Sequence, residues 1–382
     1  MTGKERMLNA YRGLPSDRIA IAPEFWYYYP AKLLGVDMIT FAREVPFHQA
    51  LKKTFDAFGC EGWGASFGGA PVPDVESKSE DRWIDDNTLE IRSTTKTPYG
   101  TLTSGSRQSR DEPGWCTERP IKDLERDMPA FEHLTFARDY SRFDPKHMRR
   151  AWEDVGDSYL LEGWLDAMFF DWFAGSREGG LEQAILDFAD EEERFLPLHE
   201  RYLDLVRRHT RAMCEKTPFE SFVIGCSWSC NSLIGPAMWR KWDKPVVAAM
   251  VDEAHRHGRL VHIHFHGRCR EALRDLVETG IDCICPFERG PGGDIDGLAG
   301  LTEAASALDG RCAMNGNVHT VETLIRGTPA DVRREVGEII AAFRGNPRVI
   351  IGTGDQVGRE TPEANLHAMI DEAKRLGTPW PR

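Results

Sequence analysis

Short apolar runs alternate with amphipathic helical segments across the second half of the chain. Five of the runs are predicted strands, at residues 221–226, 260–265, 281–286, 312–317 and 349–353. The helical segments between or after them cover residues 236–257, 268–279, 329–343 and 362–376. Gly258, Gly280 and Gly345 follow three of these helices, at the position where a left-handed C-cap is expected. This alternation predicts a parallel sheet covered by helices.

The first half of the chain adds three predicted strands, at residues 19–23, 57–63 and 159–164. A total of eight parallel strands favours a closed α/β barrel, the TIM (β/α)8 fold, and predicts a single domain over residues 1–382. Residues 83–103, with the turn Thr97-Pro98-Tyr99-Gly100, indicate an inserted antiparallel hairpin at about residues 80–105 that forms a wall or lid. Residues 113–134 are rich in proline and charge, which is typical of an extended connector.

The charge balance narrows the possible partners. The chain has 48 Lys and Arg against 61 Asp and Glu, a formal net charge of −13. Nucleic-acid binding is excluded because it requires clustered cations. No apolar stretch is long enough to predict a membrane span. Residues 1–12 are charged and resemble no signal peptide, so we expect a cytoplasmic protein. The 9 cysteines are expected to be reduced thiols, small core residues in several cases.

Three histidines alternate along the predicted strand 260–265 and just beyond it. Side chains two residues apart share one face of a strand, so His262, His264 and His266 lie on the same side. Imidazoles at this spacing can chelate a divalent cation. The alternative is that one or two of them are buried and hydrogen-bonded, and His262, the deepest, is the best candidate for that structural role.

Acidic and polar residues follow other predicted strands at the same rim. Asp355 comes after Gly352-Thr353-Gly354, where it is either a site residue or the N-cap of a turn or helix. Glu288 follows the run 284–287 and is a metal ligand, a base, or a partner of Arg289. The remaining candidates at this rim are Asn317, His319, Asp166 and Asp171.

Residues 23–30 are unusually aromatic for a segment that leaves a barrel strand. Three consecutive tyrosines cannot all be buried on one face, so we expect at least one to line a cleft. We take Trp26, Tyr27 and Tyr28 as candidate substrate-binding residues, together with Asn317. Such a cleft suits a planar, weakly charged ligand, while a quaternary amine is the main rival because aromatic rings can also cage a cation.

Several motifs resemble the uroporphyrinogen decarboxylase superfamily, and within it the methyltransferase branch. The resemblance runs along nearly the whole chain. It is carried by Lys4-Glu5-Arg6 in an opening helix, Leu14-Pro15-Ser16-Asp17-Arg18, Thr97-Pro98-Tyr99-Gly100-Thr101-Leu102, Asn315-Gly316-Asn317-Val318, Gly327-Thr328-Pro329-Ala330-Asp331-Val332 and Thr361-Pro362-Glu363-Ala364-Asn365. This resemblance implies a TIM barrel with an N-terminal helical extension and a site at the C-terminal mouth.

The resemblance also implies a zinc site and a corrinoid partner. Corrinoid-dependent methyltransferases of this kind hold zinc with a His-x-Cys-Gly motif and a second cysteine. The matching positions here are His264, His266 and Asp355, so both thiolates are replaced. A His/His/Asp set still binds zinc but makes the metal more electrophilic. The arginine-rich segment of the decarboxylases is absent from residues 24–29.

These observations predict a metal-dependent methyltransferase. It would demethylate a small methoxylated, aryl ether substrate and pass the methyl group to a corrinoid held by a separate protein. Asp355 and Glu288 are the expected catalytic residues, with Glu288 a fourth ligand or a proton donor. A decarboxylase or other lyase acting on a small carboxylic acid is the alternative, a binding protein is a third, and a homodimer is possible.

Overall fold

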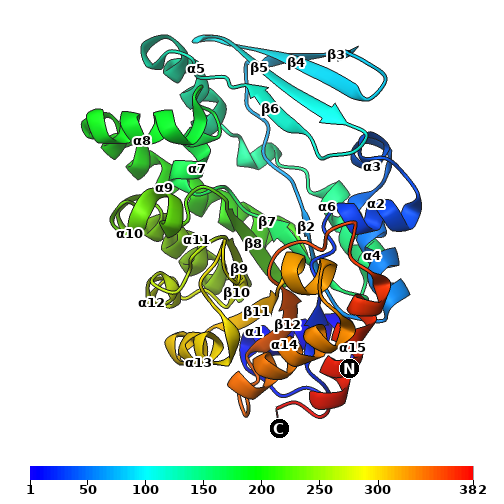
Figure 1. Ribbon diagram of the computed structural model, residues 1–382. Coiled ribbons are helices and arrows are strands. Elements are labelled where there is room, and N and C mark those ends of the chain that lie inside the picture. Colours follow the sequence, from blue (N-terminus) through cyan, green and yellow to red (C-terminus); the bar gives the residue numbers. More distant parts are fainter. Residues whose placement is uncertain (382) are drawn as a thin grey trace.

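The computed structural model describes residues 1–381, and its centre is one parallel sheet of eight strands. The strands are β1 (Ala20–Ala22), β2 (Trp63–Ser66), β7 (Leu160–Trp164), β8 (Ser221–Cys226), β9 (Leu260–Phe265), β10 (Cys283–Pro286), β11 (Ala313–Val318) and β12 (Val349–Thr353). Their spatial order is β1-β12-β11-β10-β9-β8-β7-β2. The sheet curls and is surrounded by helices (Figure 1), which confirms the TIM-barrel-like α/β fold.

The strands form where the sequence is continuously apolar, because parallel strands of a barrel are covered on both faces. Three predicted strands, 221–226, 260–265 and 349–353, match β8, β9 and β12 residue for residue. The prediction for 57–63 was wrong. Residues 57 and 58 end helix α4 (Phe47–Phe58), whose buried positions recur at helical spacing, and β2 begins only at Trp63.

Helices lie between the barrel strands along the chain, and the longer connections contain several of them. They are α2 (Tyr28–Leu34), α3 (Met38–Glu44), α5 (Leu124–Phe136), α6 (Lys146–Val155), α7 (Phe169–Ala174), α8 (Gly180–Asp190), α9 (Glu192–Lys216), α10 (Asn231–Trp242), α11 (Lys244–Arg256), α12 (Leu273–Glu278), α13 (Gly297–Leu308), α14 (Pro329–Ala342) and α15 (Glu363–Leu376), with short helices η1 (Tyr140–Arg142) and η2 (Thr320–Ile325). Among residues 1–381, no helix is both long and apolar enough to cross a membrane.

The helix ends follow local chemistry. Gly258, Gly280 and Gly345 all take positive φ values after helices, as predicted. The single predicted helix 236–257 is instead two helices, α10 and α11. Pro245 occupies the first turn of α11, the helical position that tolerates a missing N–H, and the chain therefore restarts there.

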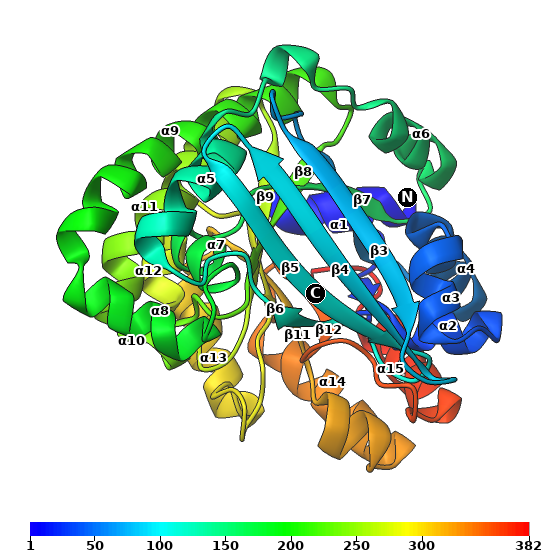
Figure 2. The ribbon, with the colours of Figure 1, turned by 90° about the horizontal axis from the view of Figure 1, so that it is seen from above.

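A four-stranded antiparallel sheet forms the insertion. It contains β3 (Glu76–Trp83), β4 (Thr88–Thr97), β5 (Gly100–Ser109) and β6 (Trp115–Glu118), paired in that order. The β4–β5 turn lies at residues 97–100, as predicted, but the predicted hairpin is only the centre of this larger sheet. The supposed connector 113–134 contains β6 and most of α5. Seen from above, β3, β4 and β5 lie across one end of the barrel (Figure 2).

The opposite end of the barrel is closed by the N-terminal helix α1 (Gly3–Arg12), the predicted helical extension. Thr2 and Glu5 form a capping box that fixes its start. Met7 and Tyr11, both fully buried, pack against the interior of the barrel, where Trp63 and Cys285 also lie. This inner cluster is distinct from the larger core between the sheet and its outer helices. Polar groups inside the barrel therefore lie far from bulk water.

Candidate active site

The three alternating histidines of β9 occupy successive depths of the barrel. His262 is fully buried, and both its ring nitrogens have partners: Nδ1 lies 3.0 Å from Glu162 Oε2 and Nε2 lies 2.9 Å from Cys285 Sγ. Its imidazole also packs edge-on against Trp63, with ring centroids 4.7 Å apart. His262 is therefore engaged in internal contacts, the role expected of the deepest histidine.

The next two histidines meet Asp355 at the mouth of the barrel. One ligand atom each from His264, His266 and Asp355 lies within 4.8 Å of the others. These residues come from the ends of β9 and β12, which the sheet order separates by two strands, so barrel curvature brings them together. We call this group the outer ligand set. Two imidazole nitrogens and a carboxylate oxygen are a donor set that suits zinc and similar divalent ions.

Glu288 supports this set through His266. Its Oε1 lies 2.7 Å from His266 Nδ1, and its Oε2 accepts a hydrogen bond from the Gly267 N–H at 3.0 Å. Arg289 is not its partner, because that side chain contacts Asn317 and Glu338 instead. A carboxylate on Nδ1 leaves Nε2 of His266 as the nitrogen for a metal, the arrangement seen around many metal-bound histidines.

The electrostatics of the mouth are those of a desolvated cluster. Burial, reinforced by His266 and His262, holds the pKa of His264 well below 6.5, so His264 is a neutral, metal-competent imidazole at pH 7. Burial lowers the pKa of His266, but the hydrogen bond to Glu288 and the charge of Asp355 raise it overall. Burial also raises the pKa of Asp355. A bound cation would relieve the crowding of acids here.

Two further residues, which we did not single out as site residues from the sequence, reach His264 from below. Glu24, two residues after β1, and Cys285 of β10 form a second group with His264 whose ligand atoms lie within 4.8 Å. Cys285 is the direct register partner of His264 on the neighbouring strand. We call Glu24, His264 and Cys285 the inner ligand set. The signal in the sequence was positional: both residues lie at or just after strand ends of the predicted barrel.

The predicted substrate residues take different places. Tyr27 lines a cavity, whereas Trp26 packs behind it against Phe47 and Trp63 at centroid distances of 5.0 and 5.1 Å. Tyr28 points elsewhere, because its hydroxyl donates to Glu112 at 2.8 Å. Asn317 is fully buried and its amide is occupied on both sides, donating to the Ile295 carbonyl and accepting from Arg289.

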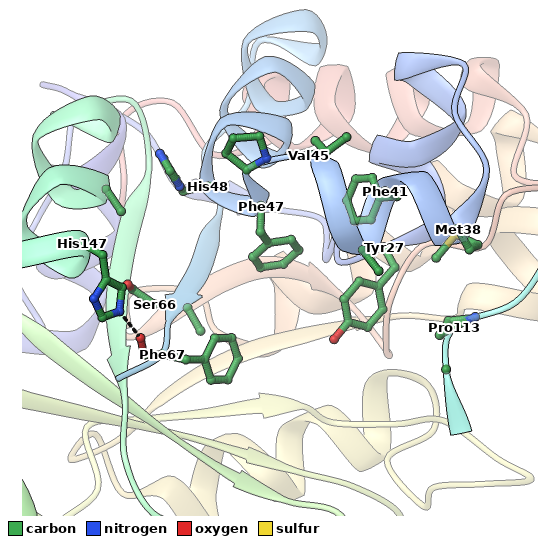
Figure 3. Close-up of a pocket in the computed structure, with 15 residues that line it drawn as sticks. Tyr27, Met38, Phe41, Val45, Phe47, His48, Ser66, Phe67, Pro113 and His147 are labelled. Atoms are coloured by element: carbon green, nitrogen blue, oxygen red, sulfur yellow. Dashed lines mark hydrogen bonds between the residues drawn. The ribbon is translucent and has the colours of Figure 1, made fainter. Parts of the chain in front are cut away.

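The cavity has a volume of about 650 Å³ and opens beside the barrel mouth. Figure 3 shows its labelled wall residues converging from the N-terminal segment with its helices, the end of β2, the segment before β6 and, through His147, α6. The lining is Tyr27, Met38, Phe41, Ala42, Val45, Pro46, Phe47, His48, Ala65, Ser66, Phe67, Pro113, Gly114, His147 and Ala151. This lining has no Lys, Arg, Asp or Glu, so it suits an apolar, uncharged body.

A chain of aromatic contacts connects the cavity to the ligand sets. Phe47 of the cavity wall touches Trp26, Trp26 touches Trp63, and the ring of Trp63 lies 5.6 Å from that of His264. Ala65, two residues beyond Trp63 on β2, also lines the cavity. The apolar cavity is therefore linked to the ligand sets through the rings of Trp26 and Trp63, and no residue of either set belongs to its lining.

Comparison with known proteins shows the family. The family model for uroporphyrinogen decarboxylase matches residues 172–376, which include β8 to β12 and both histidines of the outer set. The chain therefore belongs to the uroporphyrinogen decarboxylase family. A curated relative is the uroporphyrinogen decarboxylase of Paraburkholderia phytofirmans, 24% identical over 103 residues. That match covers 27% of this chain and about a quarter of the relative, 25%.

A solved structure resembles the chain over its full length. A methyltransferase from Methanosarcina mazei superposes with a TM-score of 0.65, covering 98% of this chain and 99% of the other. The two sequences are 15% identical, so the likeness establishes a common fold. It extends to the N-terminal part of the chain, including the antiparallel sheet, which the family model does not match.

Proposed function

We propose that the protein is a metal-dependent methyltransferase that demethylates a small methoxylated aromatic compound. The observation that carries this proposal is the outer ligand set, His264, His266 and Asp355, at the barrel mouth beside an apolar cavity. The full-length structural similarity to a methyltransferase supports it. The methyl acceptor in this proposal is a reduced corrinoid carried by a separate protein.

In this proposal the cavity, the outer ligand set and Glu288 each have a separate role. The cavity holds the aromatic ring of the substrate, with Tyr27 in its wall, and excludes water. His264, His266 and Asp355 would hold a zinc-class ion, which when bound would supply a Lewis acid for the ether oxygen. The carbon–oxygen bond of the methoxy group breaks with its electron pair left on oxygen, and the methyl carbon bonds to the electron pair supplied by reduced cobalt. Glu288 fixes the orientation of His266, and in this proposal it is also the proton donor to the departing oxygen.

One feature disfavours a porphyrin decarboxylase: the cavity lining has no lysine or arginine to bind the several carboxylates of a porphyrin precursor. The nine free thiols, seven of them buried, suit a reducing compartment, and we place the protein in the cytoplasm. A homodimer remains a prediction.

Metal analysis tests this proposal. The outer set of purified wild-type protein should hold about one equivalent of divalent metal, as purified or after titration, and the double variant His264→Ala, His266→Ala should lose it. Asp355→Asn removes the third ligand with little change of side-chain shape. It should also weaken metal binding at the outer set. Wild-type metal content in the double variant would contradict the site.

A lyase acting on a small carboxylic acid is the second candidate. The observation in its favour is the pair His266–Glu288, with 2.7 Å between Nδ1 and Oε1, which can move a proton at the mouth of the barrel. Release of carbon dioxide from a carboxylic acid, without any methyl transfer, would favour this candidate.

A further inference from the structure

The inner ligand set contains a buried carboxylate without a partner. Glu24 is 7% exposed, and no hydrogen-bond donor among residues 1–381 reaches its side-chain oxygens. The nearest group able to carry positive charge is His264, whose Nδ1 lies 3.9 Å away. Its other charged neighbours, Asp355 and Glu288, are acids. An unpaired carboxylate is costly to bury, so this position favours either a proton on Glu24 or a cation beside it.

Cys285 supplies a sulfur atom at the same place. Its Sγ lies 2.9 Å from His264 Nδ1 and 2.9 Å from His262 Nε2, and the residue is 1% exposed. The ring of His264 thus turns its Nδ1 toward Cys285 and Glu24. His262 in turn is held by Glu162, so the ring that supports the sulfur from behind is itself fixed.

The chemistry of the set selects a class of ion. A thiolate, an imidazole and a carboxylate are the three ligand types that zinc accepts, and sulfur disfavours magnesium and calcium. The ionised set carries two negative charges, one each on Glu24 and Cys285, and so compensates a divalent ion. The site lies deeper than the outer set, between β1, β9 and β10.

We propose that Glu24, His264 and Cys285 bind a zinc-class divalent ion at a site of their own, below the outer set. The proposal rests on the proposed function only in that the two sets share His264. At this site Cys285 provides a sulfur ligand. The motif positions His266 and Asp355 provide no sulfur. Binding at the inner set does not require Asp355.

Cobalt(II) titration of the whole protein tests this assignment without using activity. Cobalt bound to a thiolate shows a near-ultraviolet sulfur-to-metal charge-transfer band, and cobalt bound only to nitrogen and oxygen does not. The band should form in the wild type and in Asp355→Asn. It should be lost in Cys285→Ser, and Glu24→Gln should weaken cobalt binding by about 10-fold or more.

Cys283→Ser is the matched control, because Cys283 is buried on the same strand and in the same inner cluster but belongs to neither ligand set. It should keep the band. Circular dichroism and thermal melting identify any variant that fails to fold, and Cys285→Ala then replaces Cys285→Ser as a second test of the same sulfur.

The outcomes separate the two proposals. An unchanged cobalt spectrum and affinity in Cys285→Ser would overturn the inner site and leave the outer site standing. A Cys285-dependent band together with full methyl transfer in Asp355→Asn would support the inner site and contradict the outer one. A wild-type protein that binds no cobalt would overturn both.

Discussion

The Nδ1 atom of His266 lies 2.7 Å from Oε1 of Glu288, whose other oxygen accepts the N–H of Gly267. This contact orients the imidazole and gives the predicted metal ligand an outer support. Replacing Glu288 by glutamine keeps the size of the side chain but removes its charge. We expect Glu288→Gln to lower metal affinity by about 10- to 100-fold, measured by competition with a chromophoric chelator.

Glu182→Gln is the control for that measurement, because Glu182 is an exposed residue on α8 away from both ligand sets. Its affinity for metal should equal that of the wild type. Equal affinities in Glu288→Gln and Glu182→Gln would show that Glu288 does not support a metal ligand.

The two tyrosines 27 and 28 should behave differently although they are adjacent. Tyr27 lines the cavity, whereas the hydroxyl of Tyr28 donates to Glu112 and its ring lies under Arg359. We expect Tyr27→Leu to raise the KM for a methoxylated aromatic substrate by about 10-fold, because an aromatic contact is lost. Tyr28→Leu should leave KM nearly unchanged. Equal effects would remove Tyr27 from the binding site.

The cavity also predicts the class of ligand. Thermal-shift screening with methoxyphenols, methoxybenzoates and betaines should show stabilisation by the methoxylated aromatics, most of all by the uncharged methoxyphenols, since the lining is apolar and has no Lys, Arg, Asp or Glu. A quaternary amine could use the same rings as a cage, and the net charge of −13 favours cations. Stabilisation by betaines alone would therefore exclude the aryl ether and leave methyl transfer in place.

Asp166 was a weak site candidate, and the structure gives it a structural position. Its carboxylate pairs with Arg138 at 2.6 Å and with His209 Nδ1 at 2.5 Å. Burial raises its pKa, but His209 and Arg138 together hold it well below the usual 3.8. A lowered folded-state pKa contributes stability that is present above pH 3.8 and is lost as the pH falls through the folded value.

Asp166→Asn should therefore lower the free energy of unfolding by about 1–3 kcal/mol at pH 7, because it leaves the partly buried Arg138 and His209 without their charged partner. Urea unfolding should show the same difference down to about pH 4 and a narrowing difference below it. Asp190→Asn, at an exposed position, is the control. A difference that grows on acidification would contradict this account of the pair.

The barrel was predictable because its signals are local and repeated. Apolar runs separated by glycine-capped helices identify β8, β9 and β12 without knowledge of their partners. The outer set was predictable for a related reason: strand ends of a barrel converge, so His264 and Asp355 had to approach one another. The strand predicted at 57–63 was wrong because Phe55 and Phe58 belong to helix α4. A short apolar run does not distinguish the end of a helix from a strand.

The inner set was not predictable because it depends on register. Cys285 becomes a neighbour of His264 only through the pairing of β10 with β9, and a lone cysteine in a strand reads as a core residue. Glu24 lies in an aromatic segment, most of whose other members pack in the core or line the cavity, and nothing in the sequence set it apart from them. The side-chain amide of Asn317 is likewise occupied by Arg289 and the Ile295 carbonyl, which are distant in the sequence.

Following one labelled molecule tests whether the protein transfers a methyl group or releases carbon dioxide. A methoxybenzoate with an isotopic label in its methoxy carbon offers both a methyl group and a carboxylate, and is incubated with the metal-loaded protein and cob(I)alamin as methyl acceptor. We expect the label to move to methylcobalamin while a hydroxybenzoate forms, and Asp355→Ala to abolish both. Loss of the carboxylate as carbon dioxide, with the methoxy group intact, would contradict this expectation.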